Sequence, residues 1–135
     1  MKHLNVILLT IVMLITSTIT FAQQPDENFQ TFWKSYTTNP AFQKERTIFP
    51  LPYIYNDFDD GEENSDATET IHYIHAKDWN YDDFHNNSGS QIEIQQKNGI
   101  YIVYRIGINN GIWEEYHFNL YDGRWYLSKF YNYSD

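Results

Sequence analysis

The chain has 135 residues with nine Lys and Arg, eighteen Asp and Glu, a formal net charge of −9 and no cysteine. This balance argues against nucleic-acid binding, because phosphate contacts need a basic footprint. It argues against an anionic membrane surface for the same reason. The lack of cysteine excludes disulfides, cysteine-ligated zinc, thiol catalysis and iron–sulfur chemistry.

Residues 1–22 have the pattern of a secretory signal peptide. Lys2 and His3 give a basic start, residues 6–15 are apolar, and Thr20 and Ala22 put small residues at the positions that determine cleavage. A retained anchor is the alternative, but the apolar run is short for a spanning helix of roughly 20 residues. We therefore expect a periplasmic or secreted single domain over residues 23–135, with no membrane insertion after cleavage and no acylated cysteine.

Two short helices are predicted after the leader. Asp26 can cap the first, whose apolar residues follow helical spacing: Phe29, Phe32, Trp33 and Tyr36. It ends at Asn39, because a residue before proline is pushed out of the α region. Pro40 suits the first turn of a second helix over residues 40–44, with Ala41 and Phe42 facing inward.

Between these helices and residue 90 the pattern is mixed. Residues 46–55 look strand-like, but Pro50 and Pro52 each remove a backbone donor, so we expect an edge strand or an extended wrap. Residues 56–68 are acidic and do not fit the spacing of a calcium-binding EF-hand loop, so a solvated loop is favoured. Residues 69–77 predict a strand, and residues 78–87 a short helix or turn. His72 and His75 fall on opposite faces of that strand, so a shared metal site is disfavoured.

Residues 91–133 predict a four-stranded antiparallel meander. The turn signals are Asn98-Gly99, Asn109-Asn110-Gly111 and Asp122-Gly123, between runs of β-branched and aromatic residues. Two-residue turns would place Ile94 opposite Val103, Val103 opposite Phe118 and Phe118 opposite Leu127. One face of the sheet then becomes the core face.

A polar cluster closes one end of that core face. The register places Arg105 opposite Tyr116 and Tyr116 opposite Lys129, with Glu114 diagonal to Arg105. Two interpretations stay open: a rim salt bridge, or a cationic and phenolic lip to a ligand pocket. The candidate pocket residues are Tyr101, Arg105, Glu114, Tyr116, Trp125, Lys129 and Tyr131.

The opposite face carries large apolar side chains that a soluble monomer seldom exposes together. Another element or a second subunit must cover them, which predicts a homodimer. His117 lies in this patch, where a packed and hydrogen-bonded role is favoured over catalysis. The candidate dimer residues are Ile102, Tyr104, Ile106, Trp113, His117, Tyr126 and Phe130.

Two motifs carry a resemblance to a known family. Phe29-x-x-Phe32-Trp33 and Phe42-Gln43-x-x-Arg46-x-Ile48-Phe49-Pro50-Leu51 resemble a family of exported bacterial proteins described as a domain of unknown function. The ending Asp122-Gly123-Arg124-Trp125-Tyr126-Leu127 is similar to the last hairpin of NTF2-like, or cystatin-like, domains. The resemblance implies an α+β fold whose helices pack into a curved antiparallel sheet around a cone-shaped pocket. It also implies dimers through the other face of the sheet, and it carries over no catalytic residue.

Three functional hypotheses follow. The first is a non-enzymatic binding module of the cell envelope for a small molecule or peptide. The second is a structural or interaction protein, with a filled cone and an envelope protein as partner. The third is an enzyme of the ketosteroid-isomerase or dehydratase kind, for which Glu114, Tyr116 and Tyr131 are the available groups. Arg105 would lower the pKa of Glu114, which is the wrong direction for a general acid. No cofactor or metal is expected.

Overall fold

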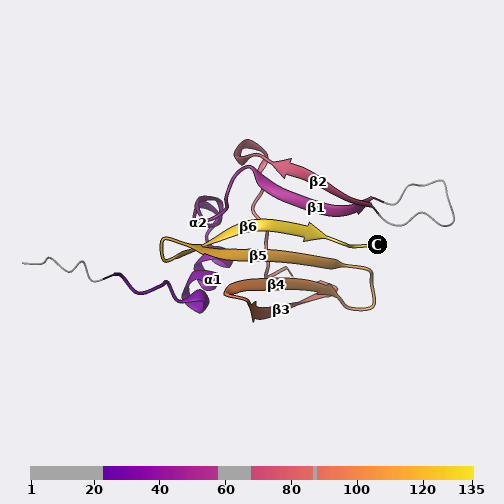
Figure 1. Ribbon diagram of the computed structural model, residues 1–135. Helices are drawn as coiled ribbons and strands as arrows, with labels where there is room; N and C mark the ends of the chain where they lie inside the picture. The colour runs from indigo at the N-terminus through magenta and orange to yellow at the C-terminus, as the bar shows by residue number, and fades with distance from the viewer. Residues whose placement is uncertain (1–22, 58–67, 87) are drawn as a thin grey trace, which may run out of the picture.

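The computed structural model describes residues 23–57, 68–86 and 88–135. The predicted signal peptide and most of the predicted acidic loop lie outside these residues. The described part contains two helices, a 3₁₀ turn and six strands that form one sheet in the order β2-β1-β6-β5-β4-β3 (Figure 1). The bounds are α1 Phe29–Thr38, α2 Pro40–Glu45, β1 Leu51–Asp57, β2 Thr68–Ile74, η1 Ala76–Asp78, β3 Ser90–Lys97, β4 Ile100–Gly107, β5 Trp113–Tyr121 and β6 Arg124–Asn132.

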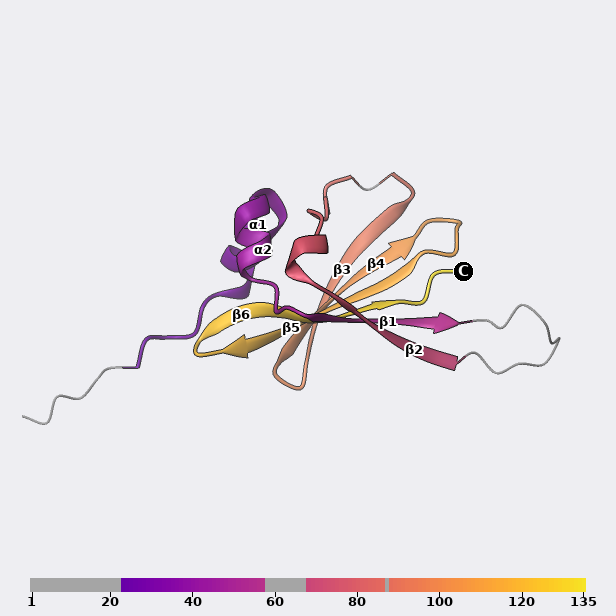
Figure 2. The ribbon, with the colours of Figure 1, turned by 90° about the horizontal axis from the view of Figure 1, so that it is seen from above.

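Both helices lie on one face of the sheet, which we call the inner face (Figure 2). The segment that follows β2 lies on the same side (Figure 2). The aromatic residues of α1 point into the sheet: Phe29, Phe32 and Tyr36 are at most 3% exposed. They pack on buried side chains of the sheet, including Val103, Phe118, Trp125 and Leu127. The helical spacing seen in the sequence thus builds the core.

The helix caps differ in detail from the prediction. Asn28, not Asp26, caps α1, because its side-chain oxygen accepts a hydrogen bond from Thr31 N at 3.0 Å. Asn39 ends α1 and also caps α2, accepting from Phe42 N at 3.1 Å. The prediction that Ala41 faces inward is wrong, since Ala41 is exposed and Gln43 is the buried residue of α2.

The prediction of an edge position for residues 46–55 is wrong. β1 lies inside the sheet, antiparallel to β2 and parallel to β6. The prolines are accommodated because β1 pairs with β6 only from Tyr53 onward. Ahead of β1 the chain passes along β6, with Ile48 N donating to Leu127 O at 2.9 Å. The outer edge is β2, which ends at Ile74 rather than continuing to residue 77.

The predicted register of the meander is confirmed for two strand pairs, in one of them as far as a β-bulge, and differs by two residues in the third. Ile94 lies opposite Val103 and Phe118 opposite Leu127, as predicted. Val103 lies opposite Tyr116 rather than Phe118, a shift of two residues. The cause is the connection between β4 and β5, which spans residues 108–112 and is closed by Gly107 N donating to Ile112 O at 2.8 Å. A two-residue shift keeps each side chain on its predicted face.

A β-bulge between His117 and Phe118 changes the faces in the second half of β6. Beyond the bulge Tyr116 pairs with Phe130, and His117 pairs with Lys129. Phe130 therefore turns to the inner face and stacks on Tyr116, with ring centroids 4.6 Å apart. The predicted pairing of Tyr116 with Lys129 is wrong for this reason.

Candidate functional site

A segment without regular structure crosses the inner face beside the helices. Gln43 of α2 fixes it, because Asp82 N donates to the Gln43 side-chain oxygen at 2.8 Å and Gln43 Nε2 donates to Asp82 O at 2.9 Å. The Tyr81 hydroxyl donates to Thr37 O at 2.7 Å. Phe84 is only 3% exposed and anchors the end of this stretch in the core. These contacts hold the Asp82 carboxylate over β4 and β5.

Asp82 joins three side chains of the sheet in one polar network. Arg105 Nη2 lies 2.6 Å from Asp82 Oδ1, and Arg105 Nη1 lies 2.7 Å from Glu114 Oε2. The Tyr116 hydroxyl accepts from Arg105 Nη1 at 3.0 Å and lies 2.7 Å from Asp82 Oδ2 and 2.9 Å from Glu114 Oε2. The guanidinium also sits over the Phe84 ring, 4.8 Å from its centroid. One cation thus ties together two carboxylates that would otherwise repel each other.

This environment keeps the proton on Tyr116. Burial raises the pKa of Tyr116 far above its ordinary value, and the charges of Asp82 and Glu114 raise that pKa further. Burial alone would lower the pKa of Arg105, but Tyr116, Asp82 and Glu114 together raise it. Tyr116 is therefore a neutral hydrogen-bond donor and Arg105 a permanent cation at any physiological pH. Neither Tyr116 nor Arg105 is therefore suited to proton transfer near neutral pH; both are suited to hydrogen bonding and charge pairing.

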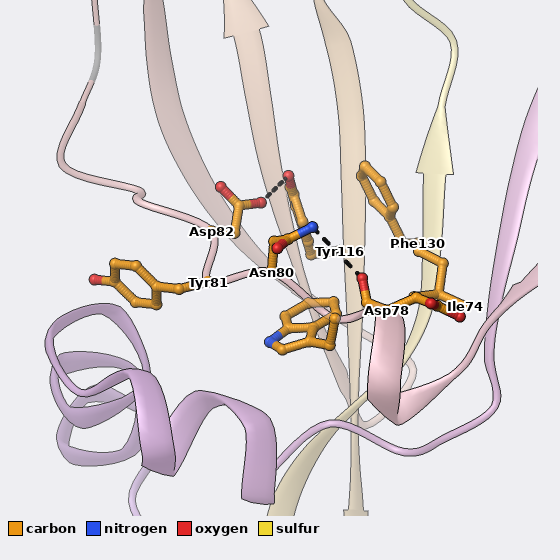
Figure 3. A pocket seen from close by; sticks show the side chains of 8 residues that line it. Ile74, Asp78, Asn80, Tyr81, Asp82, Tyr116 and Phe130 are labelled. Carbon is orange, nitrogen blue, oxygen red and sulfur yellow. Dashed lines mark hydrogen bonds between the residues drawn. The ribbon is translucent and has the colours of Figure 1, made fainter.

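A pocket of about 310 Å³ opens beside this network (Figure 3). Tyr116 and Phe130 of the sheet and Ile74 at the end of β2 form one side of it. The rest of the wall comes from Asp78, Trp79, Asn80, Tyr81 and Asp82. In Figure 3 the Asp82 carboxylate points toward the Tyr116 hydroxyl. The network therefore supports the wall of the pocket directly.

Three of the seven predicted pocket residues come together: Arg105, Glu114 and Tyr116. Of these only Tyr116 lines the pocket itself. Tyr101 and Trp125 lie on the inner face but at its filled end. Tyr101 stacks on Phe29 with centroids 3.8 Å apart, and Trp125 Nε1 donates to Glu27 O at 2.7 Å.

Lys129 and Tyr131 do not share a face with Tyr116, because the bulge reverses that half of β6. Lys129 pairs with His117 and is exposed. Tyr131 packs on His117, with ring centroids 4.7 Å apart. The predicted grouping of these two residues with the polar cluster is a wrong inference from an unbulged register.

The predicted dimer residues lie on the outer face, opposite the helices, with one exception. Phe130 belongs to the inner face. Ile102 is only 6% exposed, whereas Trp113 is 40% exposed and packs edge-on against Tyr104. His117 is bonded to Glu115 at 3.0 Å, as expected of a structural histidine. Ile106 and Tyr126 are half-buried.

Asp82 and Trp79 were not among the predicted site residues, and Phe130 was predicted for the dimer face rather than for the pocket. Asp82 is 23 residues from Arg105 in the chain and sits in an irregular segment, so no periodicity connects the two. The aromatic residues in 79–84 indicated that this segment is buried, but not which face of the sheet it covers. Phe130 would need the bulge to be known in advance.

Residues 23–57, 68–86 and 88–135 contain no group of three His, Asp or Glu side chains arranged to hold a metal ion. His72 Nε2 instead lies 2.9 Å from the Tyr55 hydroxyl. No helix in the part of the chain that the structure covers is long and apolar enough to cross a membrane.

Comparison with solved structures identifies the fold. An NTF2-like protein of Bacteroides fragilis superposes with a TM-score of 0.60 and 22% identity, over 83% of this chain and 49% of that one. A protein of Bacteroides uniformis superposes with a TM-score of 0.55 and 24% identity, over 81% of this chain and 78% of that one. The chain therefore has an NTF2-like fold, and it spans about half the length of the Bacteroides fragilis protein.

The sequence alone finds no such relatives. No protein-family profile matches the chain, and no curated protein matches it. At these levels of identity the structural likeness establishes the fold and nothing about activity.

Proposed function

We propose that the protein is an exported, non-enzymatic binding module of the cell envelope, which holds a small molecule or a short peptide in the pocket beside Tyr116 and Phe130. The observation that carries this proposal is the pocket of about 310 Å³ on a wall fixed by the Asp82–Arg105–Tyr116 network. Preorganised walls lower the cost of ordering side chains when a ligand binds. The leader-like pattern of residues 1–22 supports export.

The arrangement favours binding over catalysis. A general acid or base has to give or take a proton near neutral pH. Here both carboxylates are paired with Arg105, and the raised pKa of Tyr116 keeps its hydroxyl protonated. Tyr131, the third member of the predicted catalytic group, lies on the other face of the sheet.

Native mass spectrometry of the purified protein, without denaturation, tests the proposal. We expect a mass in excess of the chain, which identifies a bound compound. The variant Asn80→Trp places a large ring at the exposed rim of the pocket and should remove the excess, whereas Asn86→Trp, at an exposed position outside the lining, should keep it. Absence of excess mass, together with no amide shift at the pocket in an NMR fragment screen, would refute the proposal.

We also propose a homodimer through the outer face. Trp113, Ile71 and Tyr73 are 40%, 54% and 58% exposed there, which is more apolar surface than a soluble monomer usually leaves to water. Sedimentation of the protein should give the mass of two chains. Trp113→Lys should give monomers, whereas Gln30→Lys, exposed on α1 on the other side of the sheet, should not. A monomer at all concentrations in the unmodified protein would contradict the dimer.

A further inference from the structure

The wall of the pocket is acidic and aromatic. Its eight lining residues include the carboxylates of Asp78 and Asp82 but no Lys, Arg or His. Four of them carry aromatic rings, among them Trp79, Tyr116 and Phe130. Lys77 neighbours Asp78 in η1 but does not line the pocket. Both kinds of group attract cations, since carboxylates are negative and aromatic rings present a negative face.

The charged groups around the pocket also add up to a net negative charge. Arg105 is the cation of the network, and it is matched against both Asp82 and Glu114. One negative charge is left over, and the exposed carboxylate of Asp78 adds another at the rim. Burial is the main cause that raises the pKa of Tyr81, and the charges of Asp83 and Asp82 raise that pKa further.

We propose that this pocket binds an organic cation, an alkylammonium or guanidinium group attached to a small apolar body. The inference rests on the proposed binding function and names the class of its ligand. The apolar body would lie against Phe130 and Ile74, and the cationic group would face Asp78 and the ring of Trp79, which line the pocket side by side. A volume of about 310 Å³ is at the small end of ligand pockets. The ligand is therefore a single ring or one amino-acid side chain.

Such a group can belong to a free amine or to the side chain of a peptide, and matched probes separate the two. 2-Phenylethylamine, 2-phenylethanol and phenylacetate share one ring but are cationic, neutral and anionic. Nα-acetyl-lysine N-methylamide and its Nε-acetylated form are the cationic and the neutral probe for a peptide side chain. Titration of each into the purified protein, followed by amide and indole NMR shifts, gives five dissociation constants.

We expect the cationic member of at least one series to bind most tightly, and higher salt to weaken it. Asp78→Asn should weaken cation binding about threefold, the size of one exposed ion pair. It should leave the neutral probe unchanged. Glu93→Gln makes the same charge change at an exposed residue of β3, the edge strand farthest from β2, and should leave all five constants unchanged.

The outcomes separate this inference from the proposed function. Binding of the neutral or anionic probe at least as tightly as the cation would overturn the cation assignment and leave the binding module intact. An equal loss in Asp78→Asn and Glu93→Gln would also overturn it, because the effect would then be one of overall charge. Shifts at the pocket with none of the five probes would count against both proposals.

Discussion

The Tyr116 hydroxyl is the centre of the polar network at the scale of single residues. It bonds to Arg105 and to both carboxylates, and its residue is only 2% exposed. Tyr116→Phe keeps the ring that stacks on Phe130 but removes the hydroxyl's hydrogen bonds to Arg105, Asp82 and Glu114. We expect a loss of about 1–3 kcal/mol in the free energy of unfolding, measured by urea denaturation.

Tyr121→Phe is the matched control for this variant. Tyr121 lies on the same strand and is 48% exposed, so the same loss of a hydroxyl should change stability by less than about 0.5 kcal/mol. Equal effects in the two variants would mean that the network contributes nothing beyond the hydroxyl itself.

Single residues in the network also show what the sequence can predict. Arg105, Glu114 and Tyr116 were found because they lie on neighbouring strands, where a period of two and the turn positions determine the face. Asp82 was not, because its position depends on backbone bonds from Gln43, 39 residues away in the chain. Long-range side-chain bonds of this kind leave no periodic pattern.

The bulge between β5 and β6, whose extra residue is Ser128 of β6, is the feature that matters most at the scale of elements. It decides that Phe130 rather than Lys129 faces the helices. Phe130 packs between Tyr116 and Tyr53, with ring centroids 4.6 Å and 5.2 Å away. Phe130→Ala should therefore cost about 2–3 kcal/mol of unfolding free energy, whereas Lys129→Ala should cost less than about 0.5 kcal/mol. If thermal or urea unfolding showed a larger loss of stability for Lys129→Ala than for Phe130→Ala, the unbulged register, in which Lys129 faces the helices, would be correct.

α2 acts on the pocket through one buried amide. Gln43 is fully buried, and its side chain bonds to Asp82 N, Asp82 O and Tyr36 O. Gln43→Met keeps a similar volume but leaves these backbone groups unpaired. We expect a loss of about 2–3 kcal/mol in unfolding free energy, and an increase in amide hydrogen exchange that is larger in residues 79–84 than in the sheet.

Gln30→Met provides the comparison for this variant, because Gln30 is exposed on α1. It should change neither stability nor exchange in residues 79–84. Faster exchange spread evenly over the protein in Gln43→Met would show that the amide stabilises the fold in general rather than this segment.

Much of the element order follows from the sequence, and the exceptions share a cause. Turn signals and apolar spacing predicted both helices and the four strands of the meander, and the parity of the register held across three of them. The internal position of β1 and the bulge were missed because both depend on how strands pair at a distance. Pro52 argues for an edge only if β1 is paired along its full length, and its pairing with β6 starts one residue later.

At the scale of the whole molecule, the inner face has two different ends. At one end α1 fills the sheet with rings, so that Tyr101 and Trp125 are used in packing. At the other end the helices stop, and the segment from Asp78 to Asp82 covers the sheet less tightly, which leaves the pocket. The sequence hypotheses treated a filled cone and an open cone as alternatives. The molecule has both: a filled region under α1 and a pocket under the segment from Asp78 to Asp82.

The two buried tyrosines of this inner face make stability depend on alkaline pH. Burial is the largest cause that raises the pKa of Tyr36 and of Tyr116 above the ordinary value. In the unfolded chain both ionise near pH 10, while in the folded protein both keep their protons. The unfolded state then binds fewer protons, so the stability that is present below pH 10 falls as pH rises above it. Each tyrosine contributes up to about 1.4 kcal/mol per pH unit.

Urea unfolding at several pH values between 8 and 11.5 measures this slope. Tyr116→Phe should lower the slope above pH 10 by about 1.4 kcal/mol per unit, since one of the two protons is no longer involved. The control Tyr121→Phe should keep the slope of the unmodified protein, because Tyr121 is 48% exposed. Ultraviolet titration of the folded protein should show two tyrosines that ionise only when the chain unfolds. Ionisation of all twelve tyrosines in the folded state near pH 10 would contradict the buried, protonated Tyr116 on which the pocket wall depends.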